Sequence, residues 1–364
     1  MKAAVLYKPN TPLEVVELQQ QGPQANEARV KVMAAGVCHS DWHIMNGDWT
    51  LPLPMVLGHE AAGIVQEVGP GVTHVKPGDH IIFSFRANCG RCMYCAMGRS
   101  ILCDGHKSVR WAMIDGTTRL KRDGQDVFQM ARIGTFSEQV VCPAEMLVPI
   151  RKDMPWPQAA LVGCCVPTGV GAVTRCAHVE SGASVVIIGC GGVGLNVVQG
   201  ARLAGAGRII ACDLVDRKLE YATEFGATHT INAKRENVVD RVRELTGGRG
   251  ADYAFDAIGS EATTLQIVDA IRPGGTAVIV GMAAMNVRAP ITPYTMALQE
   301  KTLKGTLYGS VRPLVDFPQL VDHYMEGRLK LDQLVSRTYK LEEINDGFAR
   351  MLSGEVARGV VVFS

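Results

Sequence analysis

The chain has 364 residues, of which 47% are hydrophobic and 20% charged, and its formal net charge is +1. This length favours two domains over a single core, and the near-neutral charge, without any lysine or arginine run, argues against nucleic-acid binding. No apolar stretch approaches the roughly 20 residues of a membrane span, and the start "MKAAVLYKP" lacks the pattern of a signal peptide. We therefore expect a cytoplasmic protein with neither nucleic acid nor a membrane as partner.

The first part of the chain, residues 1 to about 165, has the pattern of a β-rich domain. Short β-like runs such as "KAAVLY", "ARVKVMAAGV", "AAGIVQEVG" and "DHIIFSF" are separated by turn signals such as "GPQ", "GPGV" and "KPGD". Runs of this length between glycine and proline are typical of strands joined by tight turns. The sequence therefore predicts strands and turns over this region.

From about residue 166 the pattern changes to alternating strands and helices. The predicted strands are "SVVIIG", "RIIACD", "THTIN", "DYAFDAIG" and "GTAVIVG", with "LKGTLYG" as a possible sixth. Helices are predicted between them at 193–205, from "DRKLEYATEF" to Gly226, at 237–246 and at 261–271. Strict alternation is typical of a doubly wound parallel sheet.

After about residue 307 the pattern is mixed again and ends on the strand "GVVVFS". The predicted organisation is an α/β fold in which a β-rich domain, 1–165 and 307–364, is interrupted by a nucleotide-binding domain, 166–306.

Eleven cysteines are many for a chain in a reducing compartment. The number is odd, so metal ligation or catalysis explains them better than disulfides. Four of them follow a C-x2-C-x2-C-x7-C pattern within 89–103: Cys89, Cys92, Cys95 and Cys103. Four thiolates at this spacing can close around one tetrahedral zinc, which then has a structural role. An iron–sulfur cluster is the competing interpretation, but no proline follows Cys103.

The segment "GVCHSDWH", Gly36 to His43, concentrates cysteine, histidine, serine and aspartate within a few positions. By itself it is more typical of a polar loop around one buried cysteine than of a reaction centre. More potential ligands lie further along, in "LGHE" at 57–60 and "LVGCCVPTG" at 161–169. Two thiolates and one imidazole would leave a fourth zinc position open, as a catalytic site requires.

The motif "GCGGVG" fits the dinucleotide-binding pattern G-x-G-x-x-G with Gly189, Gly191 and Gly194. It follows a predicted strand and opens a predicted helix, and Asp213 ends the next strand, 19 residues after Gly194. In this pattern the glycines form the tight turn, admit the pyrophosphate and let helix and strand pack closely. Asp213 favours NAD over NADP, although Arg217 lies near it.

Taken together, these motifs resemble the zinc-dependent medium-chain alcohol dehydrogenases. "GVCHSDWH", "LPLPMVLGHE", the four-cysteine segment, "LVGCCVPTG", "IGCGGVG" and "ACDLVDRK" follow one another in family order and spacing, over essentially the whole chain. The resemblance implies a GroES-like catalytic domain with an inserted Rossmann domain, NAD as cofactor and two zinc ions per chain. The segment 104–140 resembles the longer members, such as the animal-type and benzyl-alcohol-type enzymes, which implies a homodimer.

The resemblance also implies roles for single residues on the catalytic side. It assigns three ligands to the catalytic zinc: Cys38, His59 and Cys164. The carboxylates of Asp41 and Glu60 are expected to orient these ligands. Ser40 is expected to contact the substrate oxygen, and His43 to form the outer end of a proton relay. Cys165 stands beside Cys164 where glycine is common in the family, but spacing favours Cys164 as the ligand.

On the cofactor side, the resemblance places His39 and Arg358 at the pyrophosphate. It places Thr168 and Val193 near the nicotinamide, and Asp213 and Lys218 at the adenosine ribose. Many members carry arginine where this chain has His39. Four side chains are expected to line an apolar substrate pocket: Trp49, Phe85, Met130 and Met282. Such a pocket favours primary alcohols with aromatic or medium aliphatic groups, with the aldehyde as product.

Two alternatives remain open from the sequence. A related activity would be oxidation of a formaldehyde–thiol adduct, but Asp48 is the only acidic residue in the loop "NGDWTLPLP", where the formaldehyde–glutathione branch has several. The other alternative is a catalytically silent nucleotide-binding or redox-sensing protein on the same fold.

Overall fold

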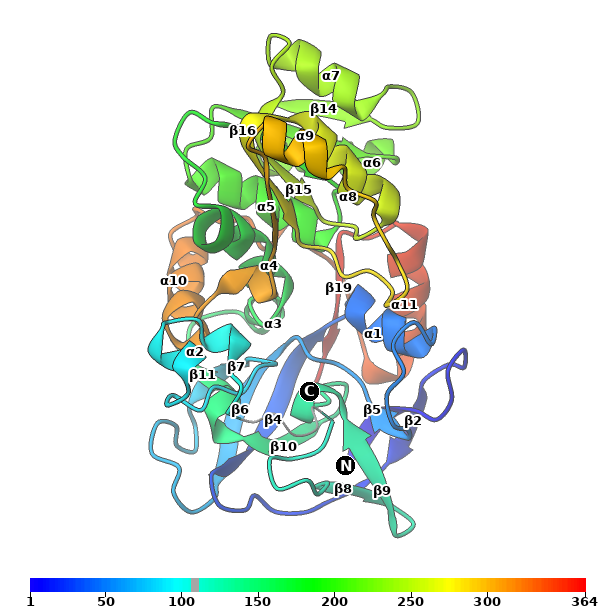
Figure 1. Cartoon of the computed structure of the whole chain (residues 1–364). Helices are drawn as coiled ribbons and strands as arrows, with labels where there is room; N and C mark the ends of the chain where they lie inside the picture. The colour runs from blue at the N-terminus through cyan, green and yellow to red at the C-terminus, as the bar shows by residue number, and fades with distance from the viewer. Residues whose placement is uncertain (106–110) are drawn as a thin grey trace. The chain divides into compact units, whose positions relative to one another are not determined.

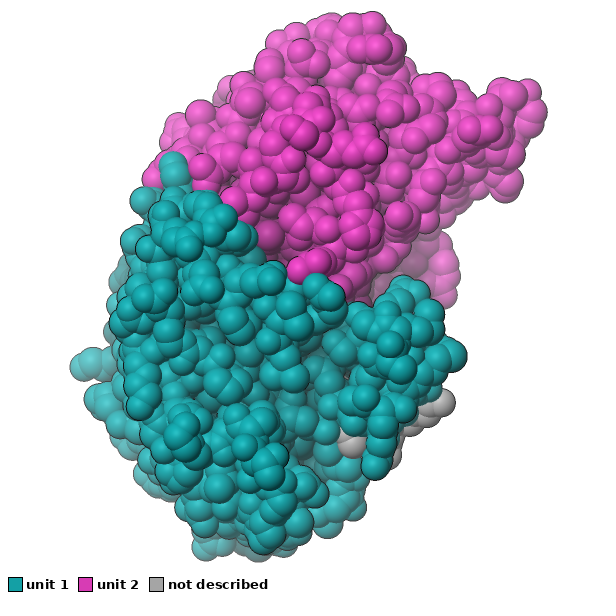
Figure 2. Space-filling view, turned by 90° about the vertical axis from the view of Figure 1, so that its left-hand side faces the viewer, with its two compact units in different colours: residues 1–164, 312–364 teal, residues 165–311 magenta. Residues whose placement is uncertain are grey.

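The computed structural model describes residues 1–105 and 111–364. The chain divides into two compact units, coloured separately in Figure 2. Unit 1 comprises Met1–Cys164 and Arg312–Ser364, and unit 2 comprises Cys165–Val311. The borders of the units thus lie at 164/165 and 311/312, whereas the sequence analysis placed the domain borders at 165/166 and 306/307. The segment 104–140, which resembles the longer family members, includes residues 106–110, and these five residues lie outside the described part of the chain.

Unit 1 is built on two β-sheets (Figure 1). The first has the strand order β2-β1-β5-β9-β8-β3, with the bounds Lys2–Leu6 (β1), Glu14–Glu17 (β2), Gln19–Gln20 (β3), Met55–Val56 (β5), Leu120–Arg122 (β8) and Gln125–Gln129 (β9). The second has the order β11-β7-β6-β4-β19-β18, with β10 also paired to β4. Its strands are Glu27–Gly36 (β4), Ala61–Val68 (β6), His80–Phe83 (β7), Gln139–Pro143 (β10), Leu147–Pro149 (β11), Val335–Tyr339 (β18) and Arg358–Val362 (β19).

The second sheet explains why the β-rich unit is split in sequence. Strand β19, from the end of the chain, pairs antiparallel with β4, from its beginning, and matches Val361 with Ala35. In β4, Val30 and Val32 are fully buried, whereas Lys31 between them is only partly buried. This alternation is what a strand with one face on a core requires. The C-terminal residues therefore complete the sheet that the first part of the chain begins.

Unit 1 also contains helices that the sequence analysis did not predict in residues 1–165. They are His39–Met45 (α1), Met93–Ala96 (α2) and Trp156–Leu161 (α3), and the C-terminal part adds Pro313–Met325 (α10) and Ile344–Ser353 (α11). Short 3₁₀ turns lie at Ser100–Leu102, Met130–Arg132, Ala144–Met146 and Leu341–Glu343. The first three helices have seven residues or fewer, too few for a helical hydrophobic period to stand out in the sequence. The prediction of strands and turns alone was therefore wrong at these segments.

Unit 2 is a parallel sheet with helices between its strands, as the sequence predicted. The strand order is β14-β13-β12-β15-β16-β17, with Ser184–Ile188 (β12), Arg208–Asp213 (β13), His229–Asn232 (β14), Ala251–Asp256 (β15), Ile271–Ile279 (β16) and Thr302–Gly305 (β17). The possible sixth strand thus exists. The helices are Cys165–Gly171 (α4), Gly192–Leu203 (α5), Asp216–Phe225 (α6), Val238–Leu245 (α7), Glu261–Ala270 (α8) and Pro293–Leu298 (α9), with a π-helical turn at Ala172–Ala177 and a 3₁₀ turn at Tyr308–Ser310.

Local signals set the ends of several helices in unit 2. Gly226 ends α6 with a φ of 117°, a left-handed conformation that favours glycine. At the start of α7 the side chain of Asn237 accepts a hydrogen bond from the backbone N–H of Asp240. Ser260 and Thr263 form a reciprocal cap at the start of α8. The agreement between pattern and structure in this unit follows from such short-range signals.

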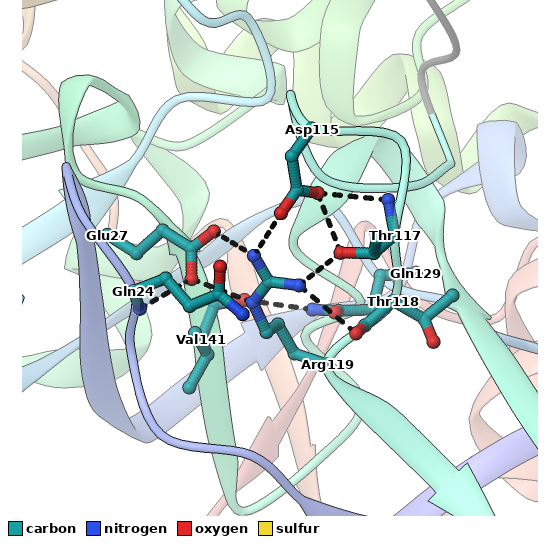
Figure 3. A network of polar contacts seen from close by, with 8 residues as sticks. All are labelled: Gln24, Glu27, Asp115, Thr117, Thr118, Arg119, Gln129 and Val141. Carbon is teal, nitrogen blue, oxygen red and sulfur yellow. Dashed lines mark hydrogen bonds and ion pairs between the residues drawn. The ribbon is translucent and has the colours of Figure 1, made fainter.

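A buried arginine connects strands that are distant in sequence within unit 1 (Figure 3). Arg119 is 1% exposed, and its Nε and Nη2 lie 2.8 Å and 2.6 Å from the two carboxylate oxygens of Glu27. Its Nη2 also donates to Asp115 Oδ2 at 2.7 Å, while Asp115 Oδ1 accepts from the backbone and hydroxyl of Thr117. Burial raises the pKa of Asp115, but its bonds to Arg119 and Thr117 outweigh this and lower it to about 2. The network fixes the segment before β8 to the start of β4.

No helix within 1–105 or 111–364 combines the length and the apolar character needed to cross a bilayer.

Candidate active site

Three metal-binding side chains meet in the interior of unit 1. The ligating atoms of Cys38, His59 and Cys164 all lie within 4.8 Å of one another, and all three residues are buried. Cys38 follows β4, His59 follows β5, and Cys164 follows α3. The structure therefore brings together the three residues that the resemblance assigned to the catalytic zinc. Cys165, the alternative sulfur, instead accepts a hydrogen bond from Asn196 Nδ2 at 3.8 Å in unit 2.

The backbone around His59 can adopt its course only with glycine before it. Gly58 has a φ of +93°, and a Cβ there would lie 2.6 Å from Thr135 Oγ1. Its N–H donates to Asp41 Oδ1 at 2.8 Å, and His59 Nδ1 lies 3.2 Å from the same oxygen. Because a carboxylate only accepts, Nδ1 donates to Asp41, and Nε2 is the ring nitrogen left for a metal. Among the described residues, His59 Nε2 is buried without a hydrogen-bond partner, which is the condition expected of a metal ligand.

The electrostatics of this triad favour a bound cation. The hydrogen bond from Cys164 lowers the pKa of Cys38 most; burial opposes it, and His59 and Arg358 lower it further. Burial lowers the pKa of His59, but the charges of Asp41 and Cys38 outweigh burial and raise it to about 10. Both shifts mean that this interior stabilises a thiolate and a positive charge beside it. Zinc, which binds thiolate and neutral imidazole, fits this donor set.

A second buried pair lies next to the triad. Glu60 is 0% exposed and Arg358, at the start of β19, is 5% exposed, and their side chains form an ion pair. A Cβ on Gly36 would lie 2.8 Å from Glu60 Cδ, so only glycine leaves room for this carboxylate. Within the described residues Arg358 Nε is buried and has no acceptor. The pairing of Arg358 with Glu60 was not predicted. The resemblance had assigned Glu60 to the zinc ligands and Arg358 to the pyrophosphate of the cofactor.

Helix α1 carries its polar side chains on two different faces. Asp41, Ile44 and Met45 are buried, whereas Ser40 and His43, three residues apart, are partly exposed. Residues at i and i+3 are neighbours on a helix surface. The predicted relay residues Ser40 and His43 therefore lie on one face, and Asp41 reaches the triad from the other. His39 is exposed at the start of the helix.

His43 has an acidic partner that the sequence analysis missed. Its Nδ1 lies 2.8 Å from Asp48 Oδ2, and its ring stacks on Trp49 with centroids 4.7 Å apart and an interplanar angle of 23°. The only sequence signal for this pair is proximity, since the chain leaves helix α1 between the two residues and no helical spacing links them.

The four-cysteine segment forms a second cluster in unit 1. The Sγ atoms of Cys89, Cys92, Cys95 and Cys103 lie within 4.8 Å of one another, and each residue is partly exposed. Backbone N–H groups donate to these sulfurs: Cys89 N to Cys103 Sγ and Cys92 N to Cys89 Sγ, both at 3.3 Å. The hydrogen bond from the backbone of Cys95 is the main cause that lowers the pKa of Cys92 to about 6. Four converging sulfurs leave no open coordination position, which is typical of structural zinc.

The glycine-rich loop of unit 2 has the geometry that a dinucleotide requires. Gly189 has a φ of +96°, and a Cβ on Gly194 would lie 1.7 Å from Gly189 O. In contrast, a Cβ on Gly191 would meet no described atom within 4 Å, so the backbone is accessible there. These three environments match a tight turn, close packing and an approach for pyrophosphate, in the roles predicted for Gly189, Gly194 and Gly191.

Asp213 ends β13 beside this loop. Its Oδ2 accepts from Cys190 N at 2.8 Å, and its Oδ1 accepts from Leu214 N at 2.7 Å and Val215 N at 3.1 Å. These bonds fix the carboxylate as an acceptor, with lone-pair capacity left for a hydroxyl.

The remaining predicted cofactor residues of unit 2 lie on helices near the glycine-rich loop. Thr168 lies on α4 and Val193 on α5, and the two helices touch so closely that a Cβ on Gly169 would lie 2.5 Å from Val193 O. Lys218 lies on α6 and is partly buried. The guanidinium of Arg217 donates to the hydroxyl of Tyr221 at 3.2 Å and lies over its ring.

The four predicted pocket residues have different surroundings. Phe85 packs edge-on against His59 with ring centroids 5.5 Å apart, so an aromatic face borders the triad. Trp49 stacks on His43, as described above. Met130 is 8% exposed and belongs to the hydrophobic core of unit 1. Met282 lies in unit 2 after β16 and is 50% exposed.

Comparison with known proteins agrees with this geometry. Residues 24–152 match the family model "Alcohol dehydrogenase GroES-like domain", and residues 192–326 match "Zinc-binding dehydrogenase". The chain is 43% identical to an NDMA-dependent alcohol dehydrogenase of Amycolatopsis methanolica, over 100% of this chain and 99% of the relative. It is 40% identical to an S-(hydroxymethyl)glutathione dehydrogenase of Paracoccus denitrificans, over 100% and 99%. The crystal structure of benzyl alcohol dehydrogenase from Acinetobacter calcoaceticus superposes with a TM-score of 0.94 at 32% identity, over 100% and 99%.

The fold and the two clusters define a zinc-binding dehydrogenase with a GroES-like catalytic unit and a Rossmann unit. The chain belongs to the zinc-dependent medium-chain alcohol dehydrogenase family. This membership confirms the resemblance seen in the sequence, and it favours zinc over an iron–sulfur cluster at the four-cysteine segment.

Proposed function

We propose that this protein oxidises primary alcohols with aromatic or medium aliphatic groups to aldehydes, reversibly, with NAD as hydride acceptor. The observation that carries the proposal is the buried triad of Cys38, His59 and Cys164. Two thiolates and one imidazole supply three of the four ligands that zinc usually has in proteins, and the fourth coordination position remains for the substrate. The four-cysteine cluster has no such position, and we assign it to structural zinc.

Zinc bound at the triad would make the alcohol hydroxyl more acidic, and bound NAD would supply the acceptor for a hydride from the adjacent carbon. The side chains of unit 1 would hold the metal, orient its ligands and move the proton. Asp41 holds His59 by Nδ1, so that Nε2 faces a metal. Ser40 takes the proton of the hydroxyl, and His43 passes it to water. The alcohol would thus lose a hydride, with its two electrons, to the cofactor and a proton to solvent.

We propose NAD as the cofactor in preference to NADP. Asp213 offers a fixed carboxylate beside the glycine-rich loop, which accepts from a ribose hydroxyl and repels an added phosphate. Arg217, a cation close in sequence that could pair with such a phosphate, is engaged by Tyr221. Asp213→Ser should narrow the preference for NAD, measured as the ratio of kcat/KM for the two cofactors. Equal use of both cofactors by the unmodified protein would contradict this proposal.

Two observations support alcohols over a formaldehyde–thiol adduct as substrate. Phe85 presents an aromatic ring beside His59, which suits an apolar substrate. Asp48, the only acid in its loop, is engaged by His43 and Asn46. The adduct remains the second candidate, because a relative at 40% identity is named for it.

A substrate screen that follows NADH absorbance tests the proposal. We expect NADH formation from benzyl alcohol that is abolished by a zinc chelator, and little from formaldehyde with a low-molecular-weight thiol. Faster turnover of formaldehyde in the presence of the thiol would favour the adduct. No turnover of any alcohol by the zinc-loaded protein would favour a silent nucleotide-binding protein.

We also propose that the protein is a homodimer, on the basis of the resemblance of segment 104–140 to the longer family members. Sedimentation equilibrium measures the mass directly, and a monomer or a tetramer would contradict the proposal.

A further inference from the structure

We propose that Asp48 is a positioning residue for proton release: it holds the imidazole of His43 in the tautomer with Nδ1 protonated and leaves Nε2 as the proton acceptor. This inference rests on the proposed function, because it assigns a partner to the residue that passes the alcohol proton to water.

The first line of support is the geometry of the pair. His43 Nδ1 and Asp48 Oδ2 are 2.8 Å apart, a distance typical of a charge-assisted hydrogen bond. A carboxylate has only acceptor capacity, so the neutral imidazole must donate from Nδ1, and its lone pair is then on Nε2. The hydrogen bond from His43 lowers the pKa of Asp48 below its ordinary value, so Asp48 stays ionised at neutral pH.

The second line of support is that the ring is held in several independent ways. Trp49 stacks on the imidazole and fixes its plane, and the backbone N–H of Trp49 donates to His43 O at 3.1 Å. The other carboxylate oxygen of Asp48 accepts from Asn46 Nδ2 at 3.3 Å. The plane of the ring is therefore set by Trp49 and its rotation within that plane by Asp48.

The third line of support is the symmetry of roles around helix α1. On the buried face, Asp41 binds Nδ1 of His59 at 3.2 Å and leaves Nε2 for the metal. On the exposed side, Asp48 binds Nδ1 of His43 in the same way. Each aspartate thus accepts a hydrogen bond from Nδ1 and leaves Nε2 available, once in a metal ligand and once in a proton acceptor. The buried contacts of Asp41 also fix the helix on which Ser40 and His43 lie.

For catalysis, the role of Asp48 is to keep the unprotonated nitrogen of His43 in place. Without Asp48 the imidazole can carry its proton on either nitrogen, and only a fraction of molecules then presents an unprotonated Nε2. Direct proton transfer in enzymes contributes about 10²–10⁴-fold to rate. Since His43 is one step removed from the alcohol, we expect its loss, and that of Asp48, to cost about tenfold.

A double-mutant cycle separates this role from a general structural one. The measured quantity is the rate of NADH formation from benzyl alcohol in a single turnover of the zinc-loaded protein. We expect Asp48→Leu and His43→Ala each to slow it about tenfold, and the double variant to be no slower than His43→Ala. Asp48→Asn keeps an acceptor oxygen toward Nδ1, so this variant should retain most of the rate of the unmodified protein. If Asp48→Leu slows the His43→Ala variant by the same factor as the unmodified protein, Asp48 does not act through His43 and the proposal is wrong.

A measurement independent of activity is the tautomer itself. With ¹⁵N-labelled histidine rings, long-range ¹H–¹⁵N correlation reports which nitrogen is protonated, and His43→Ala identifies the signal. At alkaline pH, where free imidazole is neutral, we expect Nδ1–H in the unmodified protein and in Asp48→Asn, and a mixture in Asp48→Leu. An unchanged tautomer in Asp48→Leu would overturn the proposal. This measurement remains informative even if the protein oxidises no alcohol, which would refute the proposed function instead.

A matched control is available in the same unit. Asp153 is an exposed aspartate whose carboxylate pairs with Arg151 at 2.6 Å, and its pKa is also lowered by that partner. Asp153→Leu, the same substitution as in the test variant, should leave both the single-turnover rate and the tautomer of His43 unchanged. If it slowed the reaction as Asp48→Leu does, the effect would come from the loss of any surface carboxylate, and the assignment to Asp48 would fail.

Discussion

The two cysteine clusters of unit 1 are assembled in opposite ways. The triad of Cys38, His59 and Cys164 draws on three distant segments and is buried, whereas the four-cysteine cluster lies within residues 89–103 and is partly exposed. The triad is surrounded by charged side chains, including Asp41 and the pair Glu60–Arg358. The four cysteines are instead approached by backbone N–H groups of their own segment.

The difference follows from burial. Charges in a protein interior are costly unless they are paired, so a buried site with thiolates needs partners from elsewhere in the fold. A partly exposed site is stabilised by solvent and by local backbone donors. The triad supplies three ligands in a buried setting, where a metal acts strongly on a substrate bound at the open position. We therefore propose that the distant cluster serves chemistry and the local cluster serves stability.

The strongest test of this division is Cys38→Ser. Even residues that only support a metal ligand cost 10–100-fold when changed, so loss of a ligand should lower kcat/KM for alcohol oxidation more than about a hundredfold. We expect one zinc per chain to remain and the unfolding temperature to change little. Metal analysis together with calorimetry measures both. Full activity in this variant would show that the triad is not the catalytic site.

The converse test is Cys92→Ser, which removes a ligand from the local cluster. A closed zinc site contributes folding free energy, so we expect loss of the other zinc, faster proteolysis within 89–103 and a fall in unfolding temperature of about 5 °C or more. Molecules that remain folded should keep the catalytic zinc and most of their activity. If activity falls as far as in Cys38→Ser while the fold persists, the two clusters are not separable in role.

Arg119→Met provides a loss of stability that touches neither cluster. It leaves the buried carboxylate of Glu27 without its partner (Figure 3), and breaking a buried pair in this way costs about 3–5 kcal/mol. Denaturant unfolding at pH 7 should show this loss with two zinc ions still bound. Zinc loss from this variant while it is folded would mean that metal content simply follows stability.

The same network predicts that the free energy of unfolding falls at acidic pH. The pKa of Asp115 is lowered from 3.8 to about 2 in the folded chain, so its contribution is present above pH 3.8 and is lost as the pH falls through about 2. Asp115 is 43% exposed, so solvent screening keeps this contribution small. Between pH 4 and 2, Arg119→Met should therefore lose less stability than the unmodified protein. Parallel pH profiles for the two proteins would contradict this assignment.

A last test weakens the triad without removing a ligand, by Asp41→Asn. The amide oxygen can still accept from Gly58 and His59, but the negative charge beside the triad is gone. We expect zinc affinity at the triad to fall about 10–100-fold, as for other partners of metal ligands, and the four-cysteine site to be unaffected. Competition with a fluorescent chelator measures both affinities. Equal weakening of both sites would indicate a general structural effect.

The sequence alone determined most of unit 2 and the local metal cluster. Strands and helices alternate there with strong periodic patterns, Gly226 and the glycines of "GCGGVG" mark turns, and four cysteines stand within fifteen positions. Such signals depend on neighbours in the chain, so they are legible without a structure. The roles of Cys38, His59 and Cys164 came from the resemblance, because no spacing rule links residues so far apart.

Only the tertiary structure decided the arrangement around the triad. Helix α1 is too short for a helical period, so its division into a buried face with Asp41 and an exposed face with Ser40 and His43 was not predictable. The pairing of Arg358 with Glu60 depends on β19 lying beside β4. The contact between His43 and Asp48 depends on how the chain turns after α1. In each case the partner is selected by burial and by the path of the backbone, and neither is encoded in local sequence.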